Sequence, residues 1–130
     1  MTAPEAAGFD SQTAPQLGTI GVMNCCLLIN PTHHWEDTVH QAWLLASAMR
    51  QQEVGVHSVF FYGDAVRVIN TRAADDWLAL QQQSSCRLLL CRTMMEQFDL
   101  PATQPAGFEV VGMASLASAM EQTERTVEVG

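Results

Sequence analysis

Blocks of apolar residues along the chain predict strands that alternate with helices. Ile20–Ile29 is a near-continuous apolar run, which is typical of a strand buried on both faces of a parallel sheet. A helix is predicted from Asp37 or Thr38 to about Gln52, because apolar residues recur there at helical spacing. Val56–Tyr62 is rich in β-branched and aromatic residues and predicts a second strand. Together the three segments predict a βαβ unit with parallel strands.

The second half of the chain continues the alternation in shorter pieces. A short amphipathic helix is expected to begin at Asp75 and Asp76, because acidic side chains suit a helix amino terminus. Three further strands are predicted after it, over Arg87–Cys91, Phe108–Val111 and Thr126–Val129. Between the first two lie a short helix, Arg92–Phe98, and a loop, Pro101–Gly107, and a helix over Ala114–Gln122 precedes the last strand. The predicted fold class is α/β: a three-layer sandwich with a mostly parallel sheet of about four or five strands flanked by helices.

The chain divides into an amino-terminal arm and one domain. Residues 1–18 are rich in Ala, Pro, Gln and Gly and have no periodic apolar pattern, so we expect a mobile arm there. Residues 19–130 are expected to form a single α/β domain. The arm lacks the basic and apolar segments of a signal peptide, and no apolar run approaches the length of a membrane span. We therefore expect a cytoplasmic protein with reduced thiols.

Charge and composition narrow the choice of partners. The chain has 14 acidic residues against 6 basic ones, all of them arginine. Neither nucleic acid nor an anionic membrane is therefore expected as a partner, because both bind basic surfaces. A basic protein or loop fits this charge better. Hydrophobic residues make up 48% of the chain and charged residues 15%, and this low charge content indicates contacts with other subunits.

Cys91 is the strongest candidate for chemistry. It ends the apolar segment Leu88–Leu90 and precedes the predicted helix that begins at Arg92, and ligands gather at the carboxyl ends of the strands in parallel sheets. A helix amino terminus also stabilises an anion and so favours a thiolate. The alternative is an inert buried thiol, which is the commoner state of a free cysteine. Cys86 is about 16 Å away along an extended strand, too far to form a disulfide with Cys91.

Three further side chains are candidates for supporting roles. His33 and His34 follow the first predicted strand, at the same sheet edge as Cys91, where an imidazole could accept or hold the thiol proton. The alternative is a pair of solvated loop histidines. Arg92 is adjacent to Cys91 and could stabilise its thiolate by charge. The sequence has no nucleotide-binding glycine motif and no established metal-ligand spacing, so no cofactor and no metal site are expected.

Several segments, in their order along the chain, resemble the DsrE/DsrF/DsrH (TusB/TusC/TusD) sulfur-relay family, and most closely its DsrE/TusD branch. One is a strand with a tight turn before a valine, the next is a helix with Trp77 and Leu80, and the third is the strand that ends at Cys91. The strand with the turn is Val59–Val66, and the strand that ends at Cys91 is Leu88–Cys91. A glycine turn that opens a helix, Val111–Ala117, and a segment near the carboxyl end, Glu124–Val127, complete the set.

The resemblance implies a role for Cys91 and an assembly. In that family the cysteine at the end of this strand carries a persulfide, so Cys91 is expected to pass sulfane sulfur to a partner protein thiol, as a sulfurtransferase. The implied partners are small sulfur donor and acceptor proteins, and related DsrE-, DsrF- and DsrH-like subunits or further copies of the chain in a trimer-based hexamer. The segment between Cys91 and Phe108 lacks the family's basic, glycine-containing stretch. The alternative is a non-catalytic assembly or regulatory subunit with an inert Cys91.

Overall fold

The computed structural model describes residues 24–101 and 106–130. The predicted arm, residues 1–18, and the start of the first predicted strand lie outside this part of the chain. The described residues form strands, α-helices and one 3-10 helix, η1, in the order β1 (Asn24–Ile29), α1 (Trp35–Gln51), β2 (Gly55–Phe61), η1 (Gly63–Asn70), α2 (Ala73–Ser84), β3 (Arg87–Cys91), α3 (Arg92–Gln97), β4 (Phe108–Val111), α4 (Met113–Gln122) and β5 (Arg125–Val129).

The strands join one sheet in the order β4-β3-β2-β1-β5. Each neighbouring pair of these strands is parallel. Parallel neighbours need a connection that returns the chain to the starting edge of the sheet, which is why helical segments separate the strands. The predicted three-layer α/β sandwich is confirmed, and its sheet is parallel throughout the described strands.

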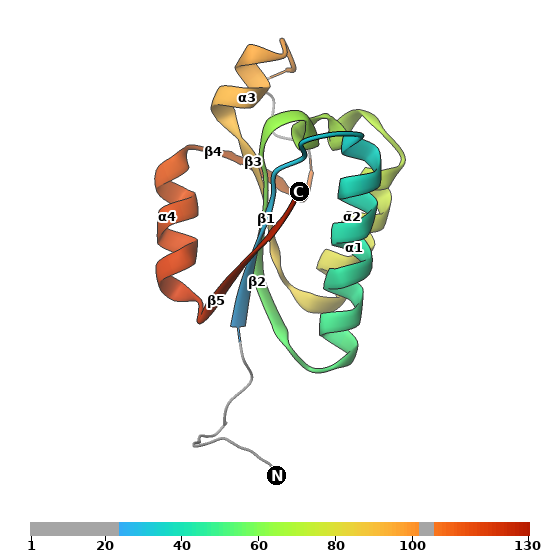
Figure 1. The fold of residues 1–130 in the computed structure, drawn as a ribbon, viewed down its shortest axis with the longest axis vertical. Coiled ribbons are helices and arrows are strands. Elements are labelled where there is room, and N and C mark those ends of the chain that lie inside the picture. The colour runs from blue at the N-terminus through green and yellow to red at the C-terminus, as the bar shows by residue number, and fades with distance from the viewer. Residues whose placement is uncertain (1–23, 102–105) are drawn as a thin grey trace.

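The helices form two layers around the sheet and leave one helix apart (Figure 1). α1 and α2 cover one face, and α4 lies on the other. α3 lies beyond the ends of the strands. Because β3 runs directly into α3, this end is the carboxyl edge of the sheet. α3 therefore lies over the edge where parallel α/β sheets gather ligands.

The first helix begins earlier than the sequence indicates. α1 starts at Trp35, before the predicted Asp37 or Thr38. The backbone carbonyl of His34 accepts hydrogen bonds from the N–H groups of Asp37 and Thr38, at 3.0 and 3.3 Å. Backbone hydrogen bonds therefore close the first turn of α1, and no side chain caps it.

The 3-10 helix η1 is an element that the sequence pattern does not predict. Gly63 and Asp64 read as a turn that closes β2, and Gly63 has the positive φ of 58° that such a turn favours. The chain then coils tightly instead of running on as a loop, and the apolar residues of η1 face inward: Ala65, Val66 and Val68 are buried. Gly63 and Asp64 mark the end of β2 in the sequence, but turn residues do not show that a helical segment follows them directly.

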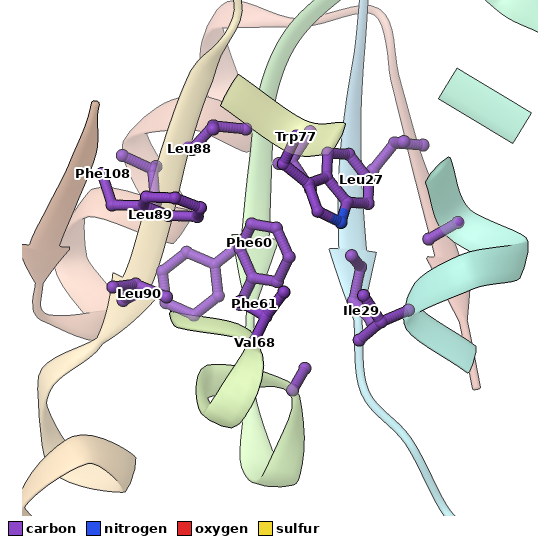
Figure 2. Close-up of a cluster of buried hydrophobic side chains, with 14 of the residues drawn as sticks. Leu27, Ile29, Phe60, Phe61, Val68, Trp77, Leu88, Leu89, Leu90 and Phe108 are labelled. Atoms are coloured by element: carbon purple, nitrogen blue, oxygen red, sulfur yellow. The ribbon is translucent and has the colours of Figure 1, made fainter. Parts of the chain in front are cut away.

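The core between the sheet and the α1–α2 layer is built around aromatic contacts (Figure 2). The ring of Phe61 meets Trp77 of α2 edge-on, with centroids 5.2 Å apart, and lies 5.8 Å from the ring of Phe108. All three side chains are buried. Aromatic pairs in such arrangements contribute about 0.5–1.5 kcal/mol beyond their buried area, so this cluster fixes α2 and the sheet against each other.

The face toward α4 carries the intervening residues, because successive side chains of a strand point to opposite faces. Since Phe61 faces α2, Phe60 faces α4, and the register of β2 with β3 places Leu89 beside Phe60. Cys91 is two residues beyond Leu89 and therefore lies on the same face. α4 covers this face with two buried side chains, Leu116 and Ala119.

Candidate functional site

Cys91 lies at the junction of β3 and α3. It is the last residue of the strand and the residue that caps the helix, with an extended backbone of φ −69° and ψ 117°. Across the sheet it pairs with Val111, the last residue of β4. Gly112 then caps α4, which begins at Met113. The Cys91 side chain therefore lies at the carboxyl edge of the sheet, beside the amino-terminal ends of α3 and α4.

The two helix ends give this edge its electrostatic character. The first N–H groups of a helix have no partner within the helix, and this end carries a partial positive charge. Neither α3 nor α4 has an acidic residue in its first turn to neutralise that charge. The arrangement therefore favours an anion beside Cys91, and both a thiolate and an ionised persulfide are anions.

All four cysteines are free and buried. Their exposed fractions are 2% for Cys25, 0% for Cys26, 2% for Cys86 and 1% for Cys91. Burial raises the pKa of Cys25, Cys26 and Cys86 above the usual value of a thiol, which keeps these three protonated near neutral pH. Exposure does not separate Cys91 from the other three. Its distinguishing feature is its position at the carboxyl edge, next to two helix ends.

His33 and His34 lie in the exposed loop between β1 and α1. The strand order places β2 between β1 and β3, so this loop is two strand positions, or about 10 Å, from Cys91 along the sheet. η1 packs against both α1 and α3 and so occupies the space between them. Both histidines share the sheet edge with Cys91, as the sequence predicts, but the structure does not place them next to its thiol. Their supporting role stays a prediction.

Arg92 reaches across the end of β4. Its Nη2 donates a hydrogen bond to the Val110 carbonyl at 3.1 Å. Its Nη1 lies 3.9 Å from the position that a Cβ on Gly112 would occupy. The hydrogen bond therefore connects the first residue of α3 to the end of β4. Because it is made to the backbone of β4, Arg92 supports the frame of the site.

Three other side chains, which sequence reasoning missed, hold the far end of α3. The guanidinium carbon of Arg67, in η1, lies 4.3 Å from the ring centroid of Phe98, which caps the carboxyl end of α3. The Arg67 Nε also donates to Asp64 Oδ1 at 2.9 Å. The spacing of Asp64 and Arg67 is visible in the sequence, but such a pair is common, and nothing in the sequence indicates its contact with Phe98.

Two kinds of feature are absent from the described residues: a group of metal ligands and a helix able to span a membrane. Within residues 24–101 and 106–130, no three His, Cys, Asp or Glu side chains are grouped closely enough to hold a metal ion. None of the helices in that part of the chain has the length and apolar character needed to cross a membrane.

Comparison with known proteins places the chain among sulfur-relay relatives. The DsrE/DsrF-like family matches residues 23–129. The chain is 27% identical over 124 residues to the sulfurtransferase TusD of Proteus mirabilis (strain HI4320), and the match covers 79% of this chain and 95% of that protein. The resemblance noted in the sequence is thus confirmed.

Solved structures show the same fold. The ychN protein from E. coli superposes with a TM-score of 0.64 at 18% identity, covering 82% of this chain and 97% of that chain. MTH1491 from Methanobacterium thermoautotrophicum, a protein of unknown function, gives a TM-score of 0.68 at 15% identity, covering 82% of this chain and 98% of that chain. The family match spans all of the described strands, and the chain belongs to the DsrE/DsrF-like family.

Proposed function

We propose that this chain is a sulfur-relay protein, a sulfurtransferase that carries sulfane sulfur as a persulfide on Cys91. The observation that carries the proposal is the position of Cys91 at the end of β3, where α3 and α4 both begin beside it. Membership of the DsrE/DsrF-like family and the likeness to a protein named as the sulfurtransferase TusD support the same assignment.

The proposed reaction is thiol–disulfide-type exchange in two steps. The Cys91 thiolate attacks the outer sulfur of a donor persulfide, the donor's sulfur–sulfur bond breaks, and the donor leaves as a thiolate. Cys91 then holds the sulfur as a persulfide, with one new sulfur–sulfur bond. An acceptor thiolate attacks that outer sulfur, and Cys91 leaves as a thiolate. The sulfur keeps its oxidation state throughout, so the transfer needs neither an oxidant nor a cofactor.

The surroundings of Cys91 fit both steps. The amino-terminal ends of α3 and α4 favour the anion that attacks in the first step and leaves in the second. Arg92 connects the start of α3 to the end of β4 through the Val110 carbonyl, just before the chain turns into α4. His33 and His34 lie beyond β2, where contact with solvent or with a docked partner is their proposed role.

The proposed partners are other proteins. They are a small sulfur donor, a small acceptor with an accessible thiol, and related DsrE-, DsrF- or DsrH-like subunits or further copies of this chain in a trimer-based hexamer. Large apolar side chains that are exposed in the single chain support subunit contact: Leu44, Leu45, Met113 and Met120. We propose a cytoplasmic location for the relay, where thiols stay reduced.

One observation favours a second candidate, a non-catalytic assembly or regulatory subunit of the same fold. Cys91 is only 1% exposed, and an inert thiol needs no access to a partner. Sulfur transfer separates the two candidates. The purified chain is incubated with a sulfane sulfur donor, freed of the donor, and mixed with an acceptor thiol while its intact mass is followed.

A relay protein gains the mass of a sulfur atom and loses it again to the acceptor, and Cys91→Ser does neither. A chain that takes up no sulfur, or that never releases it to any thiol, would instead support the assembly role.

A further inference from the structure

We propose that Arg67 is a positioning residue that controls access to Cys91 by holding α3 over the carboxyl edge of the sheet through its contact with Phe98. The proposal rests on the function proposed for Cys91. It concerns a different property of the same site: how often the thiol becomes reachable, rather than what it does when reached.

The need for such control comes from the burial of Cys91. Exchange requires an incoming sulfur to approach the reacting sulfur in line with the bond that breaks, and a residue that is 1% exposed leaves no such approach. A part of the structure that covers the edge must therefore move when a partner binds. The rest of β3 cannot move freely, because its apolar residues are buried between two neighbouring strands: Leu88, Leu89 and Leu90.

Cys91 lies on the face toward α4, but α4 is held on the sheet by its buried side chains Leu116 and Ala119. This leaves α3 as the element best placed to move. It begins directly after Cys91, contains only 6 residues, and lies apart from both helix layers (Figure 1). A helix this short is not stable by itself, so its position depends on its tertiary contacts. A displacement of α3 would change the backbone at Cys91 itself, because Cys91 is its cap.

Specific side-chain contacts hold the two ends of α3. At its start, Arg92 bonds the Val110 carbonyl. At its end, the Arg67 guanidinium lies over the Phe98 ring at 4.3 Å, and Asp64 orients that guanidinium through a 2.9 Å hydrogen bond to Nε. Met95 is buried between these ends. The Arg67 side chain is 40% exposed, so its contact with Phe98 can break without opening the core.

The test is the rate at which iodoacetamide alkylates Cys91 in the folded chain, read by peptide mapping. Arg67→Ala and Phe98→Leu should each raise this rate roughly two- to fivefold, the change expected from losing one partly exposed cation–π contact. Arg67→Lys should raise it less, because an ammonium group can still lie over the ring. The matched control is Arg87→Ala, which removes an arginine of similar exposure from an ion pair with Glu109, away from α3.

Two results would overturn the proposal. One is an unchanged Cys91 rate in both Arg67→Ala and Phe98→Leu. The other is a parallel rise at Cys86, which lies before the amino end of β3, because that would indicate loosening of the whole fold. Alkylation needs no sulfur donor, so this test is independent of the relay itself. If Cys91 never takes up sulfur but its alkylation rate rises in Arg67→Ala, the proposed function is wrong and the positioning role of Arg67 still holds.

Discussion

Cys91 and Val111 are paired across neighbouring parallel strands, and each is the last residue of its strand. Because α3 begins directly after Cys91 and α4 begins at Met113, the next residue but one after Val111, the amino-terminal ends of α3 and α4 lie beside the same point of the sheet. The pairing of these two residues therefore places a thiol where two helix ends favour negative charge. The other three cysteines lie inside β1 or before β3 and have no such surroundings.

This difference predicts the order in which the cysteines react. Near neutral pH, iodoacetamide should modify Cys91 before Cys25, Cys26 and Cys86, because only Cys91 lies beside two helix ends and directly before the short helix α3, whose displacement we propose to give access to it. Peptide mapping after limited alkylation gives the order directly. Equal or slower labelling of Cys91 would show that its position gives it no special reactivity.

The two loop histidines should have little influence on that rate. β2 separates their loop from β3, so the two exposed histidines lie about 10 Å from Cys91 along the sheet, beyond the reach of a hydrogen bond to its thiol. We expect His33→Ala and His34→Ala to change the alkylation rate of Cys91 by less than roughly twofold. Rates for both variants at several pH values test this. A large drop in either variant would mean that the histidine approaches Cys91 in solution and acts on its proton.

The aromatic cluster should dominate the stability of the sheet. Phe61 is fully buried against Trp77 and Phe108, so Phe61→Ala should lower the free energy of unfolding by about 3–5 kcal/mol. Gln82, which is exposed on α2, provides a control whose replacement by Ala should change it by less than about 0.5 kcal/mol. Urea denaturation measures both. Similar losses in the two variants would contradict the assignment of the core to this cluster.

An ion pair on the face toward α4 should make part of the stability depend on pH. Arg87 donates two hydrogen bonds to Glu109, at 3.1 and 2.8 Å. These bonds hold the pKa of Glu109 below its ordinary value near 4.5. A carboxyl with a lower pKa in the folded state stabilises the fold above its unfolded pKa, and this contribution is lost as the pH falls through the folded pKa.

Glu109→Gln should therefore lower the free energy of unfolding most at neutral pH, by about 0.5 kcal/mol for a pair this exposed. The difference between Glu109→Gln and wild type should shrink as the pH falls below 4.5. Urea unfolding at several pH values measures it. A difference that stays constant with pH would show that the charge of Glu109 is not what stabilises the fold.

The general fold was predictable because local patterns determine it. The second strand was predicted over Val56–Tyr62 and is observed as Gly55–Phe61, and the predicted Arg87–Cys91 strand has the same bounds in the structure. Runs of buried residues make these strands visible in the sequence. The same reasoning gave the junction at Cys91, since an apolar run ends there and a polar helix follows.

What the sequence did not provide was the order of the strands and the contacts between distant residues. The carboxyl ends of parallel strands share one edge, which correctly grouped His33 and His34 with Cys91. The order β3-β2-β1 was needed to show that β2 stands between them. The contact of Arg67 with Phe98 depends on how η1 packs against α3. Neither feature leaves a periodic pattern in the chain.

The central claim is that Cys91 is the residue that carries sulfur. The most direct test digests the chain after incubation with a sulfane sulfur donor, under conditions that preserve persulfides, and weighs the cysteine-containing peptides. Wild type and the control Cys86→Ser should both gain the mass of one sulfur atom on the peptide with Cys91, and Cys91→Ser should gain none. Sulfur retained by Cys91→Ser, or found on the other cysteines with the Cys91 peptide unmodified, would contradict the claim.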